Sequence, residues 1–141
     1  MAALDLNAIR AVIEGRLATE LSLAPAIPVV FHNMAYTPTP ISTWVQCQVS
    51  FGNNNYVTMG TGAGAINSVI GVAVINIFSA KGVGPGASLI VAKRIRDLYV
   101  RINTSGVRFD PPIGPEVVAT PSPEGYFQTQ VRLTFETFED L

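Results

Sequence analysis

The chain has 141 residues, the size of one domain with a single core, so a second domain does not fit. It is 48% hydrophobic and only 13% charged, where about a quarter charged is typical of globular proteins. A net charge of −1 argues against broad electrostatic capture of nucleic acid, and one cysteine allows no internal disulfide. We therefore expect a single domain over residues 1–141, made in a reducing cytosol.

The charges are unevenly distributed along the chain. No Asp, Glu, Lys or Arg occurs between Glu20 and Lys81. Prolines and the glycine-asparagine run at 52–55 interrupt this stretch before about 20 apolar residues accumulate, so we expect no membrane span. The first residues lack the basic start and apolar block of a signal peptide, so none is expected. We interpret the uncharged stretch as surface that contacts other protein.

The first element in chain order is a helix over residues 5–21. Apolar side chains recur every three or four residues and form one face: Leu6, Ile9, Ile13, Leu17 and Leu21. Asp5 is the expected N-cap. Arg10 with Glu14, and Arg16 with Glu20, are spaced as ion pairs on the opposite side.

Short strands and extended chain follow the helix. Residues 27–31 predict a strand, 34–43 an extended Pro/Thr connection, and 43–51 a strand with period-two alternation. Val45, Cys47 and Val49 form its inward line, opposite Trp44, Gln46, Gln48 and Ser50. Residues 52–55 suit a turn, and 59–65 a mobile loop.

The second half repeats the order of helix and strands. Residues 66–80 predict a strand that is apolar, and therefore covered, on both faces. Residues 85–102 predict a helix with Lys93–Asp97 and Asp97–Arg101 charge pairs, and with this inward stripe: Val91, Ile95, Leu98 and Ile102. Short strands flank a Pro-Pro corner in 106–118, and 125–138 form a long amphipathic strand. The order predicts an α+β fold, a mainly antiparallel sheet with two helices packed on one face.

The glycine-rich turn GVGPGA at 82–87 satisfies the G-x-G-x-x-G/A pattern of dinucleotide-binding turns. Such a turn needs an acidic residue about 20 positions later, and residues 103–106 contain none. A P-loop would need a lysine where this chain has Ala87. We interpret Gly82, Gly84, Pro85 and Gly86 as a structural turn, with nucleotide binding kept as an alternative.

Residues for other chemistry are scattered. His32 has no second histidine near it in sequence, and Cys47 lies on the inward line of its strand, so we expect no catalytic, metal or cofactor site and no enzyme. A DNA-binding stripe would use these basic residues: Lys93, Arg94, Arg96, Arg101 and Arg108. Asp97 and Asp110 interrupt that stripe, which favours a solvated helix face.

Several passages in order resemble the tail terminator family of long-tailed bacteriophages, the lambda-type tail-tube-capping proteins. These passages are NAIRAVIEGRL, YTPTPISTWVQCQVSF, GVAVINIFSAKGVGPGASLIVAKRIRDLY and EGYFQTQVRLTFET. Members often carry an arginine just before the buried strand, and this chain has none in residues 65–70. No role is therefore carried over for that side chain.

The resemblance implies a structural virion protein. Such a protein forms a ring, usually of six subunits, that caps the tail tube, ends its polymerisation and offers a surface to the head connector. Its implied partners are further copies of itself, the tail tube protein, the head-tail connector or neck protein and the tail sheath, with genomic DNA only passing through the lumen. The implied location is the head-proximal end of the virion tail, after synthesis in the host cytoplasm and with no membrane partner. A neck or tail-completion adaptor is the alternative.

Contacts with other subunits or with the tube are expected among uncharged residues in the middle of the chain. We assign them to Trp44, Gln46, Gln48, Asn54, Tyr56 and Met59, together with the loop expected at 52–65.

Overall fold

The computed structural model describes residues 5–23, 25–31, 34, 43–60, 64–82, 85–104, 106–118 and 126–140. Within these ranges the chain forms two helices and seven strands. In order they are α1 (Leu6–Ser22), β1 (Val29–Phe31), β2 (Trp44–Tyr56), β3 (Ile66–Ala80), α2 (Gly86–Tyr99), β4 (Asn103–Thr104), β5 (Val107–Phe109), β6 (Ile113–Val117) and β7 (Tyr126–Asp140). One sheet contains the strands in the order β1-β2-β3-β7-β5-β4, and β6 also pairs with β7.

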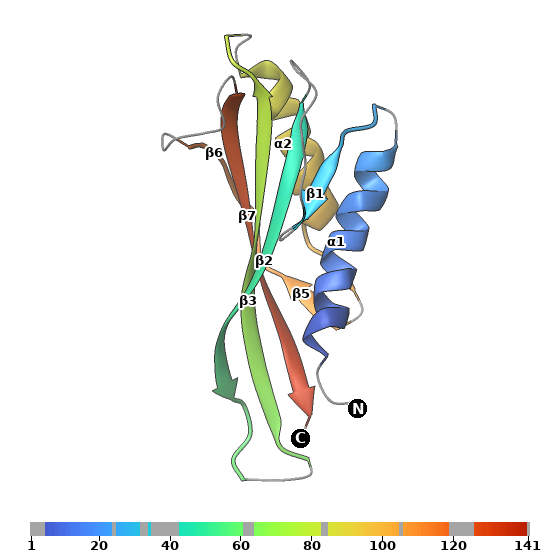
Figure 1. The fold of residues 1–141 in the computed structure, drawn as a ribbon. Coiled ribbons are helices and arrows are strands. Elements are labelled where there is room, and N and C mark those ends of the chain that lie inside the picture. The colour runs from blue at the N-terminus through green and yellow to red at the C-terminus, as the bar shows by residue number, and fades with distance from the viewer. Residues whose placement is uncertain are drawn as a thin grey trace.

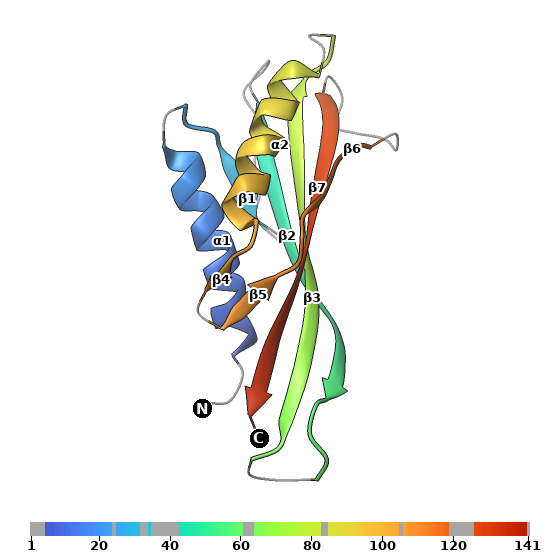
Figure 2. The same ribbon diagram turned by 180° about the vertical axis from the view of Figure 1, so that it is seen from behind.

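Both helices cover the same face of this sheet. Figure 1 views the sheet from the side away from the helices, and Figure 2 views it from the helix side. β1 is parallel to β2, and the other described pairs are antiparallel. The core lies between the layers and includes Leu17 of α1, Ile95 of α2 and Ile75 of β3. The predicted α+β fold is confirmed.

α1 begins where the sequence predicts. The Asp5 carboxylate accepts hydrogen bonds from the backbone N–H groups of Asn7 at 3.0 Å and Ala8 at 3.3 Å, so it satisfies two donors that a helix start leaves unpaired. The predicted apolar face is buried from Ile9 onward, whereas Leu6 is about half exposed. Leu6, the first residue of α1, belongs to this apolar face by its spacing but is not part of the core.

Only one of the two predicted ion pairs within α1 forms. Arg10 pairs with Glu14 at 2.6 Å, although Glu14 is buried rather than on the outer side. The predicted Arg16–Glu20 pair is wrong. Glu20 instead pairs with Arg94 of α2, and Arg16 Nε donates to the Leu98 carbonyl at 3.1 Å. The second helix packs beside the first and supplies partners that helical spacing cannot reveal.

The turn predicted at residues 52–55 is wrong, because β2 continues through them to Tyr56. The register with β3 shifts there: Phe51 pairs with Gly71, and the next pair is Asn54 with Val69. Between these two pairs β2 contains one more residue than β3, which is a β-bulge. The glycine and asparagines that suggested a turn bend a strand instead.

β3 has the predicted bounds, but its two faces differ. Ala73, Ile75 and Ile77 are fully buried beneath the helices, whereas Val72 and Val74 on the other face are only partly buried. The expectation that β3 is covered on both faces is therefore wrong within this chain, since both helices lie on one side.

α2 is shorter than predicted. It ends at Tyr99, Arg101 adopts a positive φ of 54°, and β4 begins at Asn103. The Lys93–Asp97 pair forms at 2.6 Å, but the expected Asp97–Arg101 pair does not, because Arg101 lies beyond the helix. Ile102 packs against the core from outside α2.

The C-terminal strands follow the predicted pattern. β5 and β6 flank the Pro-Pro corner, and the inward residues Val131, Leu133 and Phe135 of β7 are fully buried. The Phe135 ring fills the space beside Gly71, where an added Cβ would lie 2.4 Å from Phe135 Cζ. Glycine is required on β3 at this point because an aromatic ring from β7 occupies its side-chain position.

Candidate interaction surfaces

The helix-free side of the sheet carries a mostly uncharged surface, which we call the open face. It consists of side chains from the three central strands: Gln46, Gln48, Ser50, Ile70, Val72, Val74, Gln130 and Thr134. Val72 pairs with Ser50 on one side and Thr134 on the other, so the middle of the apolar stripe on β3 lies between polar, uncharged neighbours. All of these side chains are partly or fully exposed.

Two charged side chains of β7 lie on the same side of the sheet, Arg132 opposite Val74 and Glu136 opposite Ile70, and both are paired. Arg132 on β7 faces Glu116 of β6 at 3.5 Å. Glu136 binds Arg108 of β5 and accepts a hydrogen bond from Ser68 Oγ at 2.8 Å. Because these carboxylates already have cationic partners, the centre of the open face stays electrically neutral.

Trp44 lies on the open face but is mostly buried. It is only 7% exposed, stacks on Phe78 with ring centroids 4.2 Å apart, and meets Tyr126 edge-on at 6.0 Å. These rings and Val30 form a second, smaller apolar cluster. Trp44 thus contributes mainly to packing within the subunit, and its place in an intersubunit contact stays a prediction.

The end of the β2–β3 hairpin forms a separate exposed surface, the hairpin tip, residues 54–60. It lies beyond the ends of both helices (Figure 1). Tyr56 is 89% and Met59 100% exposed, and Val57 is also exposed. The β2 bulge places Asn54 and Tyr56 opposite Val69 and Asn67, on the other face of the strand from Gln46 and Gln48. The predicted contact residues therefore fall on two surfaces, which sequence alternation alone could not show.

The outer edge of β2 is paired over a short length only. β1 pairs with Val45, Gln46 and Cys47. From Gln48 to Tyr56, no strand in the described part of the chain pairs with that edge. Free backbone donors and acceptors at a strand edge can pair with another chain.

The glycine turn connects the end of β3 to the start of α2. Gly82 has φ +89°, Pro85 occupies the N-cap position of α2, and Gly86 is the first helical residue. Gly84 lies outside the described residues, as does His32. The strand before the turn, β3, has antiparallel neighbours on both sides, whereas a dinucleotide fold carries its turn between parallel strands.

Cys47 is a core residue, as predicted. Burial raises the pKa of its thiol to about 12, and the negative charge of Glu14 acts in the same direction. A thiol with this pKa carries almost no nucleophilic thiolate at neutral pH. Within the described ranges no three His, Cys, Asp or Glu side chains are grouped to hold a metal ion, and neither helix is long and apolar enough to cross a membrane.

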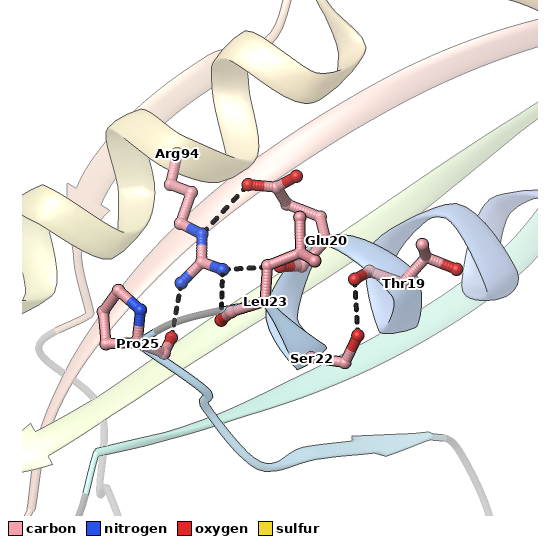
Figure 3. Close-up of polar contacts among 6 residues, drawn as sticks. All are labelled: Thr19, Glu20, Ser22, Leu23, Pro25 and Arg94. Atoms are coloured by element: carbon pink, nitrogen blue, oxygen red, sulfur yellow. Dashed lines mark hydrogen bonds and ion pairs between the residues drawn. The ribbon is translucent and has the colours of Figure 1, made fainter.

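Arg94 holds the two helices together, and sequence reasoning placed it only in a basic stripe. Its guanidinium donates to the Glu20 carboxylate at 3.0 Å and to three carbonyls at or just beyond the end of α1, those of Glu20, Leu23 and Pro25 (Figure 3). Arg16 of α1 donates in return to Leu98, near the end of α2. Each arginine thus places positive charge where a helix end is negative.

Residues 8–135 match the sequence profile of the family described as phage tail terminator protein. The chain belongs to this family. The match includes both helices from Ala8 onward and most of the sheet. This tail terminator is therefore a structural protein of phage tail assembly, of a family located in the virion tail and associated with tail and head components.

A solved structure supports the fold of this tail terminator independently. It superposes with a TM-score of 0.69 at 18% sequence identity, covering 95% of this chain and 96% of the other. At that identity the similarity establishes the fold alone. No curated protein matches the chain.

Proposed function

We propose that this tail terminator forms a closed ring of six subunits on the end of the tail tube. The ring stops tube polymerisation and presents a surface to the head connector. The number of subunits follows the family resemblance. Capping requires no catalysis, only a subunit that binds the growing end and does not offer that end again.

The open face is the observation that carries this proposal. Ile70, Val72 and Val74 form an apolar stripe. Its middle residue, Val72, has the uncharged neighbours Ser50 and Thr134, and the charged neighbours of the outer two, Glu136 and Arg132, already bind partners within the subunit. Protein interfaces are depleted of charge at their centre and polar at the rim, which is this arrangement. A ring joins two different patches of each subunit, so much of each subunit's surface must tolerate burial. We assign the open face to contacts between subunits.

The hairpin tip is assigned to the tube protein. Tyr56 and Met59 are almost fully exposed, and they lie at the end of a hairpin that extends past the helices. Tyrosine and methionine are enriched in interfaces because they bury large areas. An exposed tip of this composition suits a contact with a different protein beyond the subunit's own layers.

Light scattering with and without tube protein tests both assignments. Val72→Glu adds a charge to the open face, and Met59→Glu adds one to the tip. Thr19→Glu on the exposed side of α1 is the matched control. We expect Val72→Glu to prevent ring formation while circular dichroism remains native. We expect Met59→Glu to retain self-assembly but to lower capping of tube ends, and Thr19→Glu to behave as the wild type.

The outcomes separate the possible functions. A wild-type chain that stays monomeric with and without tube ends would overturn the capping proposal. A ring that binds an isolated connector, but not an isolated tube, would indicate the adaptor function instead. Identical behaviour of all three variants would remove both surface assignments.

A further inference from the structure

Most basic side chains of this chain have an acceptor within the subunit. Six of the nine Lys and Arg side chains contact a carboxylate, a side-chain amide or a backbone carbonyl: Arg10, Arg16, Lys93, Arg94, Arg108 and Arg132. For the remaining three, Lys81, Arg96 and Arg101, no acceptor occurs among the described residues. Lys81 is exposed in the turn before α2.

The two unpaired arginines line the same cavity. It has a volume of about 470 Å³ and lies between the end of α2 and the corner after β5. Its lining consists of Arg96, Val100, Arg101, Phe109, Pro111 and Pro112. Two arginines thus line a recess whose other lining residues are apolar, and no carboxylate is among the described residues that line it.

Arg96 is the more enclosed of the pair. Its Nε is buried, and none of the described residues places an acceptor within hydrogen-bonding distance. A buried donor without a partner costs free energy, and more so when it carries charge. In contrast, the groove between α1 and α2 is lined by Arg16, Glu20 and Arg94, whose polar groups already bind one another or the helix ends.

Arg101 adopts an unfavourable backbone conformation. Its φ of +54° is in the left-handed region, and among the described residues it is the only non-glycine residue there. The position follows the C-cap of α2, where glycine or asparagine is usual. A long charged side chain in a place that favours glycine suggests that the side chain has a function.

We propose that the Arg96–Arg101 cavity binds a carboxylate side chain on an acidic segment of another protein chain. Guanidinium groups match a carboxylate with two parallel hydrogen bonds, and the ring of Phe109 with Pro111 and Pro112 contacts the apolar part of the entering segment. A DNA phosphate suits the cavity less well. Duplex DNA needs a broad basic face, whereas in this chain Asp97 lies between the two arginines in sequence and Asp110 directly precedes the two prolines.

This chain contains an acidic segment of the required kind. Residues 133–141 include Glu136, Glu139 and Asp140 and no lysine or arginine. In the folded subunit this segment is the end of β7, where Glu136 already binds Arg108. We therefore assign the carboxylate to an acidic segment of a different protein, and a second copy of this chain is an outcome of the test. The site itself does not depend on the ring.

The test follows the side-chain Nε–Hε signals of Arg96 and Arg101 by NMR at about pH 6, in the full chain. The first probe is a blocked peptide of residues 134–141, TFETFEDL. The second is an acidic peptide of unrelated sequence, and the third is TFQTFQNL, the neutral counterpart of the first. We expect saturable shifts with the acidic peptides and none with the neutral one. Shifts with both acidic peptides support a different acidic protein as the partner, and shifts with the first acidic peptide alone would assign the site to a second copy instead.

Three variants separate binding from folding. Arg101→Gly removes the side chain and relieves the backbone, so we expect unchanged or higher thermal stability and binding at least about tenfold weaker. Arg96→Lys keeps the charge but loses the planar group, and should also weaken binding. Lys81→Gln removes an equally unpaired charge elsewhere and should bind as the wild type.

Three results would overturn the proposal. The first is equal shifts with the neutral peptide. The second is equal weakening by Lys81→Gln, which would mean non-specific attraction. The third is a response to a DNA duplex without a response to either acidic peptide.

Discussion

Arg94 on α2 binds Glu20 on α1 twice, through the side chain and through the backbone. Its Nε lies 3.0 Å from the Glu20 carboxylate, while its terminal nitrogens bind carbonyls at the end of α1 (Figure 3). The arginine is therefore both an ion-pair partner and a cap for the first helix. The C-cap residue of α1 is Leu23 rather than glycine. Arg94 therefore donates hydrogen bonds to carbonyls that a local C-capping motif would otherwise satisfy.

Replacing Arg94 is expected to lower stability substantially. Arg94→Ala removes every one of these hydrogen bonds, and we expect the free energy of unfolding to fall by about 2–3 kcal/mol. Glu20→Gln should cost less, because the carbonyl contacts of Arg94 remain. Urea denaturation followed by circular dichroism measures both changes.

Lys93→Ala is the matched control for Arg94→Ala. Lys93 directly precedes Arg94 and pairs with Asp97 on the exposed side of α2. Exposed pairs contribute little, so the change should stay within about 0.5 kcal/mol. Equal losses for the two variants would show that Arg94 acts only as surface charge.

Gly71 is expected to tolerate no side chain. In Gly71→Ala the new Cβ would lie 2.4 Å from Phe135 Cζ and 2.6 Å from the Ser50 carbonyl oxygen. Overpacking of this kind should lower the free energy of unfolding by about 2–3 kcal/mol or more. Thermal and urea denaturation provide the measurement.

A second substitution tests the cause of that loss. Phe135→Leu shortens the ring side chain, so in the double variant the cost of Gly71→Ala should be smaller than in the wild type. Strictly additive losses would mean that the clash with the Ser50 backbone decides the effect and the ring does not.

The glycines of the turn before α2 should differ in their tolerance of alanine. Gly82 has a positive φ, so Gly82→Ala should cost about 1–2 kcal/mol. Gly86 begins a helix, and a Cβ there would meet nothing within 4 Å. Gly86→Ala should therefore be neutral or stabilising by up to about 1 kcal/mol. The comparison uses denaturation midpoints of the two variants. A severe loss in Gly86→Ala would point to a close approach by another molecule at this turn.

The buried thiol of Cys47 should make stability depend on alkaline pH. Its pKa is about 12 in the folded chain against 9.0 for an unperturbed thiol. Between these values the unfolded chain releases a proton that the folded chain keeps. Stability therefore falls as pH rises through 9, and the contribution is fully present below that pH.

The expected size of this effect is about 1.4 kcal/mol between pH 8 and pH 10, obtained by linkage from the unfolded chain's pKa. Urea denaturation of the wild type and of Cys47→Ala over this range isolates it, because other titrating groups are common to both. Parallel pH dependences in the two proteins would contradict the assignment.

Local patterns in the sequence predicted the elements well. The spacing in α1, the alternation in β2 and β7 and the bounds of β3 all describe neighbours along one chain segment, and such periodicity depends on backbone geometry alone. The local residue types gave a wrong prediction where pairing with another strand determines the structure. Residues 52–55 suit a turn, yet pairing with β3 holds them in β2 as a bulge.

The sequence by itself determined the fold class, the inward position of Cys47 and the family resemblance, because these depend on hydrophobic period and residue order. Only the tertiary structure decided which groups meet. It joined Arg94 to the end of α1, brought Arg96 and Arg101 to one cavity, and separated Gln48 from Tyr56 by a bulge. Contacts between distant segments depend on register and on helix placement. A one-residue shift in either moves a side chain to another face, so no local pattern specifies them.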